Sequence, residues 1–312
     1  MKILITGGAG YIGSTLCEYL LKNKHKVTVL DTFMFSNNSL NAYMSDKNFS
    51  VYQEDVRNIK SIKKYLSEHD VVVPLACLVG APLCNLKEDE ANQVNFQSIK
   101  AMIDNLSKDQ YVIYPTTNSG YGVGEKDKYC TEDTPLKPIS VYGKTKVQAE
   151  EYIANKFPNS TRLRLATVFG ASPRMRLDLL VNDFVYRATK DKFIVLFESH
   201  FKRNFIHIRD VCRAMIMSIE DQENFSGETF NLGLSDANLS KLELCLEIKK
   251  YIPKFEILES EIGKDIDKRD YIVSNEKIES KGFKPAHSIN DGVEELMKLF
   301  KYLIPSESMR NF

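Results

Sequence analysis

A tyrosine and a lysine four residues apart, Tyr142 and Lys146, are the pair in this chain best suited to proton transfer. Near the start of a helix, this spacing puts both side chains on one face. An ammonium group beside a phenol lowers the pKa of the phenol, which favours a phenolate base near neutral pH. Thr117 follows a strand-like segment at 111–116, and its hydroxyl could hydrogen-bond a substrate oxygen beside Tyr142. The competing interpretation is an ordinary tyrosine–lysine pair on the surface.

Three glycines near the chain start, Gly7, Gly10 and Gly13, follow an apolar run at residues 3–5. An amphipathic segment at 12–23 comes next. Strand, glycine turn and helix in this order are the context of a dinucleotide-binding fingerprint. The glycines let the backbone approach a pyrophosphate, and the helix N-terminus offers free N–H groups to the phosphates. The competing interpretation is a common glycine turn.

An aspartate ends the second strand-like segment. Asp31 directly follows residues 26–30. A carboxylate at this place can accept hydrogen bonds from both hydroxyls of an adenine ribose, and it would repel a 2′-phosphate. The expected cofactor is therefore NAD rather than NADP, and the competing interpretation is a turn aspartate at the end of a strand.

The overall charge and the cysteines exclude several classes of protein. Lys plus Arg and Asp plus Glu number 42 each, which gives no support for binding to nucleic acid or to a membrane surface. The six cysteines have no metal-ligand spacing, so we expect reduced thiols, no metal site and a cytoplasmic location. No apolar run reaches the roughly 18 residues of a membrane span, and we expect no signal peptide before the first strand.

Strand-like and helix-like segments alternate through the first half of the chain. The alternation predicts an α/β fold, a doubly wound parallel Rossmann sheet with helices on both faces. The strands are expected at 2–6, 26–30, 49–53, 70–75, 111–116 and 161–167, and the helices at 12–23, 58–68, 91–107 and 144–157. We expect residues 1–170 to form an NAD-binding domain, with returning segments from about 185–192 and 207–234. Residues 171–312 are expected to form mainly a smaller substrate-binding lobe, and the last seven residues to be frayed.

With these motifs in this order, the chain resembles the extended short-chain dehydrogenases/reductases that act on nucleotide sugars, over nearly its whole length. The resemblance implies that Tyr142 is the general base, that Lys146 binds the nicotinamide ribose and tunes Tyr142, and that Thr117 completes a triad. The implied cofactor contacts are Gly7, Gly10, Tyr11, Ile12, Gly13, Asp31, Asp55, Val56, Leu75, Ala76, Asn95, Tyr142 and Lys146. For Asp55, the competing interpretation is a turn residue that caps a helix.

The resemblance also implies contacts to the substrate. Arg203 matches an arginine that reaches the nucleotide, and Arg269, in the run Lys268-Arg269-Asp270, matches one that binds the diphosphate. The planar fork of arginine meets phosphate oxygens bidentately. The other expected substrate contacts are Asn118, Ser119, Arg174, Arg176 and Asn182. The competing interpretation of the arginines is solvated surface charge.

Departures from the family pattern limit which reactions this chain is expected to catalyse. Related 4,6-dehydratases carry an Asp-Glu pair directly after the catalytic threonine, where this chain has Asn118 and Ser119, so we do not expect dehydration. A 3,5-epimerase would need further acid–base groups. Cys84 is available near the sugar, whereas His207 is expected to order structure.

Three strings narrow the resemblance further: LVGAPLC at 78–84, TNSGYG at 117–122 and SPRMRLDLLVNDF at 172–184. Together they resemble bacterial GDP-heptose 4-dehydrogenases of capsular polysaccharide biosynthesis, which oxidise C4 of GDP-D-glycero-α-D-manno-heptose. The resemblance therefore implies a GDP-heptose substrate, whereas the residues themselves indicate only a nucleotide sugar.

Three functions stay open. The leading hypothesis is an NAD-dependent 4-dehydrogenase of a GDP-sugar, in which a 2-oxo acid such as 2-oxoglutarate reoxidises the cofactor. The second is a UDP-hexose 4-epimerase, which shares the first half-reaction. The third is a non-catalytic NAD-sensing protein on the same fold. The helices expected near 91–107 and 144–157 carry apolar residues that include Val147, Ile153 and Phe157. Because the superfamily pairs the equivalent helices in a dimer interface, the resemblance implies a homodimer or a dimer of dimers.

Overall fold

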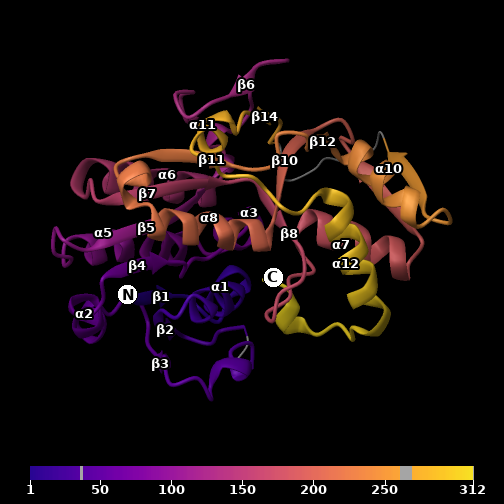
Figure 1. The fold of residues 1–312 in the computed structure, drawn as a ribbon. Coiled ribbons are helices and arrows are strands. Elements are labelled where there is room, and N and C mark those ends of the chain that lie inside the picture. Colours follow the sequence, from indigo (N-terminus) through magenta and orange to yellow (C-terminus); the bar gives the residue numbers. More distant parts are fainter. Residues whose placement is uncertain (36–37, 261–268, 312) are drawn as a thin grey trace.

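The computed structural model describes residues 1–35, 38–260 and 269–311, which form a layered α/β structure (Figure 1). Its main sheet contains β1 (Lys2–Thr6), β2 (Lys26–Asp31), β3 (Phe49–Gln53), β4 (Val71–Pro74), β5 (Tyr111–Thr117), β7 (Ser160–Leu165) and β11 (Thr229–Leu232). All neighbouring strands are parallel, in the order β11-β7-β5-β4-β1-β2-β3. The order reverses between β1 and β4, the point at which such sheets bind ligands. The expected doubly wound fold is confirmed.

Helices cover both faces of this sheet because alternate side chains of each strand point to opposite sides. In β1, Ile3 and Ile5 enter one buried cluster and Leu4 enters the other. The first cluster includes residues of α1 (Tyr11–Lys22) and α8 (Ile208–Glu220), and the second includes residues of α2 (Ile59–Ser67), α5 (Ser98–Ile103) and α6 (Val141–Lys156).

Two expected elements differ in the structure. The helix expected at 91–107 is divided into α4 (Glu88–Asn92), a π-helical turn η2 (Gln93–Gln97) and α5. The strand expected at 161–167 ends at Leu165, and β8 (Thr167–Phe169) then pairs with a different sheet. A short helix, α3 (Ala81–Leu86), was not expected. Hydrophobic periodicity does not reveal a change of hydrogen-bond register or of strand partner, which explains these differences.

The smaller lobe is built mainly from the second half of the chain and lies beside the main sheet (Figure 1). Its strands are β8, β10 (Lys202–His207) and β12 (Asn238–Ser240) in one sheet, β9 (Phe193–Phe197) with β13 (Glu256–Ser260), and β6 (Tyr129–Cys130) with β14 (Ile272–Val273). Its longer helices are α7 (Leu180–Lys190), α10 (Lys241–Tyr251) and α12 (Ile289–Tyr302), and a shorter one is α11 (Glu276–Ser280). The short helix α9 (Gln222–Phe225) belongs to the main sheet, where the Phe225 carbonyl accepts the Thr161 hydroxyl of β7. One buried cluster joins this lobe to the sheet, so the domain boundaries given above stay a prediction.

The described residues at the end of the chain, up to Asn311, make defined contacts, contrary to the expected fraying. A short 3-10 helix, η4 (Glu307–Met309), follows α12, and the Met309 carbonyl accepts a hydrogen bond from Leu177 N–H at 2.8 Å. Asn311 is 8% exposed. The polar composition of this tail gives no sign of these tertiary contacts. Among the described residues, no helix is long and apolar enough to cross a membrane.

Candidate active site

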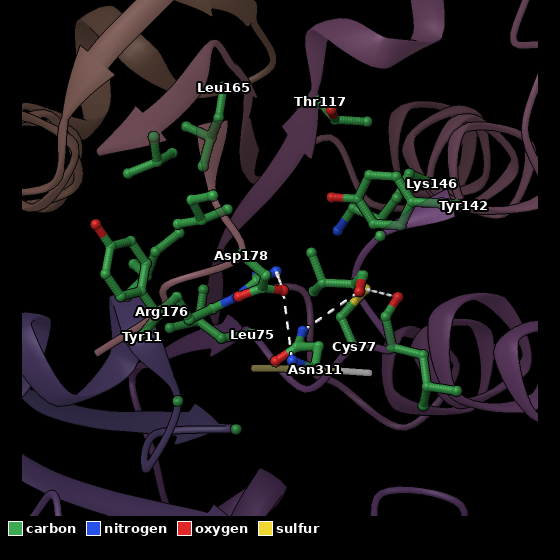
Figure 2. A pocket seen from close by; sticks show the side chains of 18 of the residues that line it. Tyr11, Leu75, Cys77, Thr117, Tyr142, Lys146, Leu165, Arg176, Asp178 and Asn311 are labelled. Carbon is green, nitrogen blue, oxygen red and sulfur yellow. Dashed lines mark hydrogen bonds and ion pairs between the residues drawn. The ribbon is translucent and has the colours of Figure 1, made fainter. Parts of the chain in front are cut away.

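A cavity of about 760 Å³ opens at the carboxyl ends of β1, β4 and β5, between the main sheet and the smaller lobe. Figure 2 shows its centre, where Tyr142 and Lys146 of α6 face the loop that carries Cys77. Most of the residues expected from the sequence line this cavity. They are Gly7, Gly10, Tyr11, Ile12, Gly13, Asp31, Asp55, Val56, Leu75, Ala76, Thr117, Ser119, Tyr142, Lys146, Arg174, Arg176, Arg203 and Arg269.

The glycine turn forms a cradle in front of α1. Gly7 has φ +72°, and a Cβ there would lie 2.5 Å from the backbone nitrogen of Ala76. A Cβ at Gly10 would meet only the Gly7 carbonyl oxygen, at 3.1 Å, on the cavity side of the turn. No side chain caps the start of α1, so its first N–H groups and positive dipole end can receive phosphate oxygens. These residues fit the diphosphate of a dinucleotide.

Asp31 holds this turn together from the end of β2. Its carboxylate accepts N–H groups of Ala9 at 2.9 Å and Phe33 at 2.8 Å. Burial raises the pKa of Asp31, and the N–H groups of Phe33 and Ala9 act against that rise. Asp31 also lines the cavity, so the expected ribose contact fits its place and stays a prediction.

The Tyr142–Lys146 pair lies at one wall, but its electrostatics differ from the expectation. Lys146 donates from Nζ to the Pro115 carbonyl at 2.6 Å and lies 4.0 Å from the ring centroid of Tyr114. Burial lowers the pKa of Lys146. Burial also raises the pKa of Tyr142, although the positive charges of Arg269 and Arg176 act in the other direction. The expected lowering of the phenol pKa is therefore wrong for this structure, because loss of solvation outweighs the nearby charges.

A chain of hydroxyls leads from Thr117 to an arginine. Thr117 Oγ1 accepts the Ser119 N–H at 3.1 Å and donates to Ser119 Oγ at 2.9 Å. Arg269 Nη1 donates to the same Ser119 Oγ. Lys268, the neighbour of Arg269 in the expected run, lies outside the described residues. The arrangement orders Thr117 at the cavity wall and links it to a positive charge.

Three asparagines that we expected to contact ligands do not line the cavity. Asn118 is 1% exposed, and among the described residues its side-chain amide has no hydrogen-bond partner. Asn95 accepts Leu78 N–H at 2.8 Å and donates to Thr145 Oγ1 at 3.3 Å, so it ties the cavity loop to α6. Asn182 accepts Gly170 N–H at 3.0 Å and donates to the Tyr11 hydroxyl at 3.3 Å. The positions of Asn95 and Asn182 support roles in orienting neighbours rather than ligand contact.

The acidic and basic groups at the rim pair with one another. The Asp55 carboxylate receives both the backbone N–H of Arg57, at 2.9 Å, and its Nε, at 3.0 Å. The side chain of Asn58, and not that of Asp55, caps α2. Val56, beside Asp55, is buried at the cavity wall.

The cavity arginines are not solvated surface groups. Arg174, Arg176 and Arg203 are 4%, 6% and 3% exposed. Arg176 donates from Nη2 to Asp178 at 2.6 Å, and Arg203 donates from Nη1 to the Lys202 carbonyl at 2.8 Å. The competing interpretation of solvated charge is therefore wrong for these three residues.

Cys77 and Asn311 are cavity residues that the sequence did not reveal. Cys77 follows Leu75 and Ala76 directly, and that adjacency was the available signal. Burial raises the pKa of the Cys77 thiol, with Lys146 acting against the rise. Cys84, which we considered as a sugar contact, is instead fully buried, donates to the Leu78 carbonyl at 3.2 Å and does not line the cavity.

Comparison with known proteins identifies the family to which this chain belongs. Residues 3–233 match the NAD dependent epimerase/dehydratase family. The chain belongs to this family. Members of this family use NAD as cofactor and act on nucleotide sugars. The protein is therefore an NAD-dependent enzyme of the nucleotide-sugar epimerase/dehydratase type. NAD is the cofactor that the glycine cradle and Asp31 fit.

Similar proteins cover nearly the whole chain. The low-salt glycan biosynthesis protein Agl12 of Haloferax volcanii is 27% identical over 307 residues, covering 94% of this chain and 96% of that protein. A UDP-glucose 4-epimerase of Corynebacterium glutamicum is 28% identical and covers 92% of each chain. The UDP-glucuronic acid 4-epimerase of Bacillus cereus, solved with UDP-glucuronic acid and NAD, superposes with a TM-score of 0.82 at 28% identity, covering 96% of this chain and 99% of the other.

Proposed function

We propose that this family member oxidises C4 of a nucleotide sugar, and that the sugar is GDP-D-glycero-α-D-manno-heptose. The observation that supports the oxidation is the convergence of Tyr142, Thr117 and Lys146 on one wall of a cavity that also contains the glycine cradle. When bound, NAD supplies the acceptor for the hydride that leaves C4. The resemblance of three strings to GDP-heptose 4-dehydrogenases supports the sugar.

In the proposed reaction, Tyr142 accepts the proton of the C4 hydroxyl. Because burial raises the pKa of its phenol, the positive charges of Arg269 and Arg176 are needed to make Tyr142 a usable base. The Thr117 hydroxyl donates to Ser119 Oγ in this structure, and in the proposed reaction it turns that hydrogen to the same sugar oxygen, while Ser119 Oγ keeps its bond from Arg269. We propose that Lys146, whose Nζ donates to the Pro115 carbonyl, contacts the nicotinamide ribose.

The arginines at the substrate side of the cavity can bind the diphosphate of the sugar nucleotide. We propose that Arg203 and Arg269 bind it, since both line the cavity and Arg203 is almost completely buried. Buried guanidinium groups bind phosphate oxygens through charge-assisted hydrogen bonds. Asn118 and Ser119 occupy the place of the Asp-Glu pair of related dehydratases, and this supports oxidation without loss of water.

A UDP-hexose 4-epimerase is the second candidate. The observation that favours it is the similarity to a UDP-glucose 4-epimerase and to a UDP-glucuronic acid 4-epimerase at 28% identity. Both candidates share removal of hydride from C4, and they differ in whether hydride returns to the sugar.

For the dehydrogenase, we propose that a 2-oxo acid such as 2-oxoglutarate reoxidises the cofactor in the emptied sugar site. The carboxylates of such an acid would use the arginines that otherwise hold the diphosphate. The keto carbon of the acid would receive the hydride that the reduced cofactor holds, and its keto oxygen would receive the proton that Tyr142 took from the C4 hydroxyl. The products would be a 2-hydroxy acid and the oxidised cofactor.

The test is a substrate panel with product analysis. Purified protein is incubated with GDP-heptose, GDP-mannose, UDP-glucose and UDP-glucuronic acid, with and without 2-oxoglutarate, and the sugars are examined by NMR. We expect a 4-keto product from GDP-heptose, with repeated turnover only when 2-oxoglutarate is present. A C4-inverted UDP-sugar and no change in GDP-heptose would replace this proposal with the epimerase.

A further inference from the structure

Arg174 is a buried cation in the cavity that forms no ion pair with a described residue. Arg174 is 4% exposed, and among the described residues no carboxylate forms an ion pair with it and its Nε has no hydrogen-bond partner. The nearest carboxylates are engaged elsewhere, since Asp178 pairs with Arg176, and Asp31 accepts two backbone N–H groups. Burial lowers the pKa of Arg174 to about 10, and the charge of Arg176 adds to this effect. A desolvated guanidinium in a cavity requires an anion.

The position of Arg174 indicates which anion this is. Its backbone N–H donates to Ser14 Oγ at 3.4 Å, and the hydroxyl of Ser172 donates to the Tyr11 carbonyl at 2.7 Å. The segment that carries Arg174 is therefore fastened to the first turn of α1, whose N-terminus no side chain caps. The guanidinium itself lies 4.6 Å from the ring centroid of Phe35, beyond the end of β2. Both contacts belong to the cofactor half of the cavity.

The C-terminal tail fixes the direction of this guanidinium. Arg174 Nη2 donates to Asn311 Oδ1 at 2.8 Å. Asn311 is held on both sides of the cavity, because its N–H donates to Asp178 at 3.4 Å and its Nδ2 donates to the Val79 carbonyl at 3.3 Å. Figure 2 shows Asn311 between the Arg176–Asp178 pair and the loop of Cys77. The tail thus crosses from the smaller lobe to the loop after β4.

We propose that Arg174 binds the diphosphate of the NAD cofactor opposite the glycine cradle, and that Asn311 is the positioning residue that holds Arg174 there. The C-terminal tail consequently controls how long the cofactor stays bound. The inference rests on the cofactor alone and not on which sugar is oxidised, so it can fail or succeed separately from the proposed reaction. Arg174, which was expected from the sequence to contact the substrate, is thereby assigned to the cofactor instead.

The experiment measures cofactor binding without any sugar. NADH is bound to the purified protein and chased with excess NAD, and the loss of bound nicotinamide fluorescence gives the dissociation rate. Competition with NADH then gives the affinities of ADP-ribose and adenosine, and calorimetric titration gives those of GDP and UDP, which are expected at the substrate side. The variants are R174Q, R174K, N311A and the double variant, and K301Q is the matched control because Lys301 is an exposed cation on α12.

We expect R174Q to speed NADH dissociation and to lower the affinity for ADP-ribose about 10- to 100-fold. The affinities for adenosine, GDP and UDP should be unchanged. R174K should lie between R174Q and the parent, because lysine keeps the charge but loses the fork. N311A should speed dissociation in the parent but add nothing in the R174Q background, which separates positioning from a merely structural role. K301Q should behave as the parent.

Other results would overturn the proposal. A lower affinity for GDP or UDP, with an unchanged affinity for ADP-ribose, would assign Arg174 to the sugar nucleotide. Equal weakening of adenosine and ADP-ribose would show a structural effect. If thermal unfolding shows that R174Q is not folded, R174K and N311A decide the question. Unchanged NADH dissociation rates in both of these variants would refute the proposal.

Discussion

At the scale of single residues, the chemistry depends on how a buried phenol is made to accept a proton. Burial raises the pKa of Tyr142, and the charges of Arg269 and Arg176 oppose this. Lys146 is engaged by the Pro115 carbonyl. The motif spacing correctly places Tyr142 and Lys146 at one cavity wall, but it carries no information on desolvation. Desolvation depends on the whole surrounding protein and decides the direction of the pKa shift.

The first prediction concerns the base. Tyr142→Phe should leave the fold and NADH binding intact and reduce kcat/KM for the sugar about 10²- to 10⁴-fold, because a positioned general base is lost. For the parent, kcat/KM should rise with pH from about 6 to 9, since the phenol pKa is raised and more phenolate forms as pH increases. Steady-state rates across pH test both points. Turnover of the phenylalanine variant within a few-fold of the parent would assign the base to another group.

The second prediction concerns cofactor choice. Asp31→Ala should weaken NAD binding and reduce the preference for NAD over NADP by about 10-fold or more, because a negative charge near the ribose is removed. Asp31→Asn is the comparison variant that removes the charge at nearly constant size. Its single amide oxygen can accept only one of the Ala9 and Phe33 N–H groups, which Asp31 accepts on separate oxygens. Calorimetric titration with both cofactors gives the ratio. Equal affinity of the unmodified protein for NAD and NADP would contradict the assignment.

At the scale of elements, the sequence predicts best where one pattern determines one element. The parallel strands β1 to β5 and the helix α1 follow from apolar runs, a glycine turn and helical periodicity. The π-helical turn Gln93–Gln97, the short helix Ala81–Leu86 and the ordered tail do not. The tail depends on contacts between segments far apart in the chain, since Asn311 bridges Asp178 and Val79.

An ion-pair network ties α12 to the start of α8, and it provides the third prediction. Burial would raise the pKa of Glu295, but His207, Arg209 and the Ala171 N–H outweigh it and lower the value to about 2. Glu295→Gln should therefore lower Tm by about 2–6 °C near neutral pH. Because the folded pKa lies below the ordinary 4.5, the difference should shrink as pH falls from about 4.5 towards 2.

The control for this element is Glu294→Gln, which changes an exposed neighbour on the same helix. Thermal unfolding of both variants is followed by circular dichroism at several pH values. A Glu295→Gln effect that is constant between neutral pH and pH 3 would show that the charge of Glu295 is not what stabilises this junction.

At the scale of the whole molecule, the cavity is assembled from both halves of the chain. The glycine cradle and the triad come from the first half, whereas Arg203 and Arg269 come from the second. The order of motifs predicted the first set well. The second set was predicted only through the resemblance, because isolated arginines have no characteristic spacing and their burial follows from tertiary structure.

The fourth prediction concerns assembly. The resemblance implies a homodimer through the helices near 91–107 and 144–157, and this remains a proposal. The apolar residues that we first assigned to that interface, Val147, Ile153 and Phe157, are instead buried inside the protomer. Light scattering at micromolar concentration should nevertheless give two or four times the mass of one chain. A monomer would exclude a stable dimer.

The most direct test of the proposed reaction is one turnover with GDP-heptose that carries deuterium at C4. The fate of the deuterium is followed by mass spectrometry of the released cofactor and sugar. We expect deuterium on the reduced nicotinamide and a 4-keto sugar in solution, and neither product with Tyr142→Phe. Deuterium that returns to a C4-inverted sugar, with the nicotinamide oxidised at the end, would contradict the dehydrogenase and establish an epimerase.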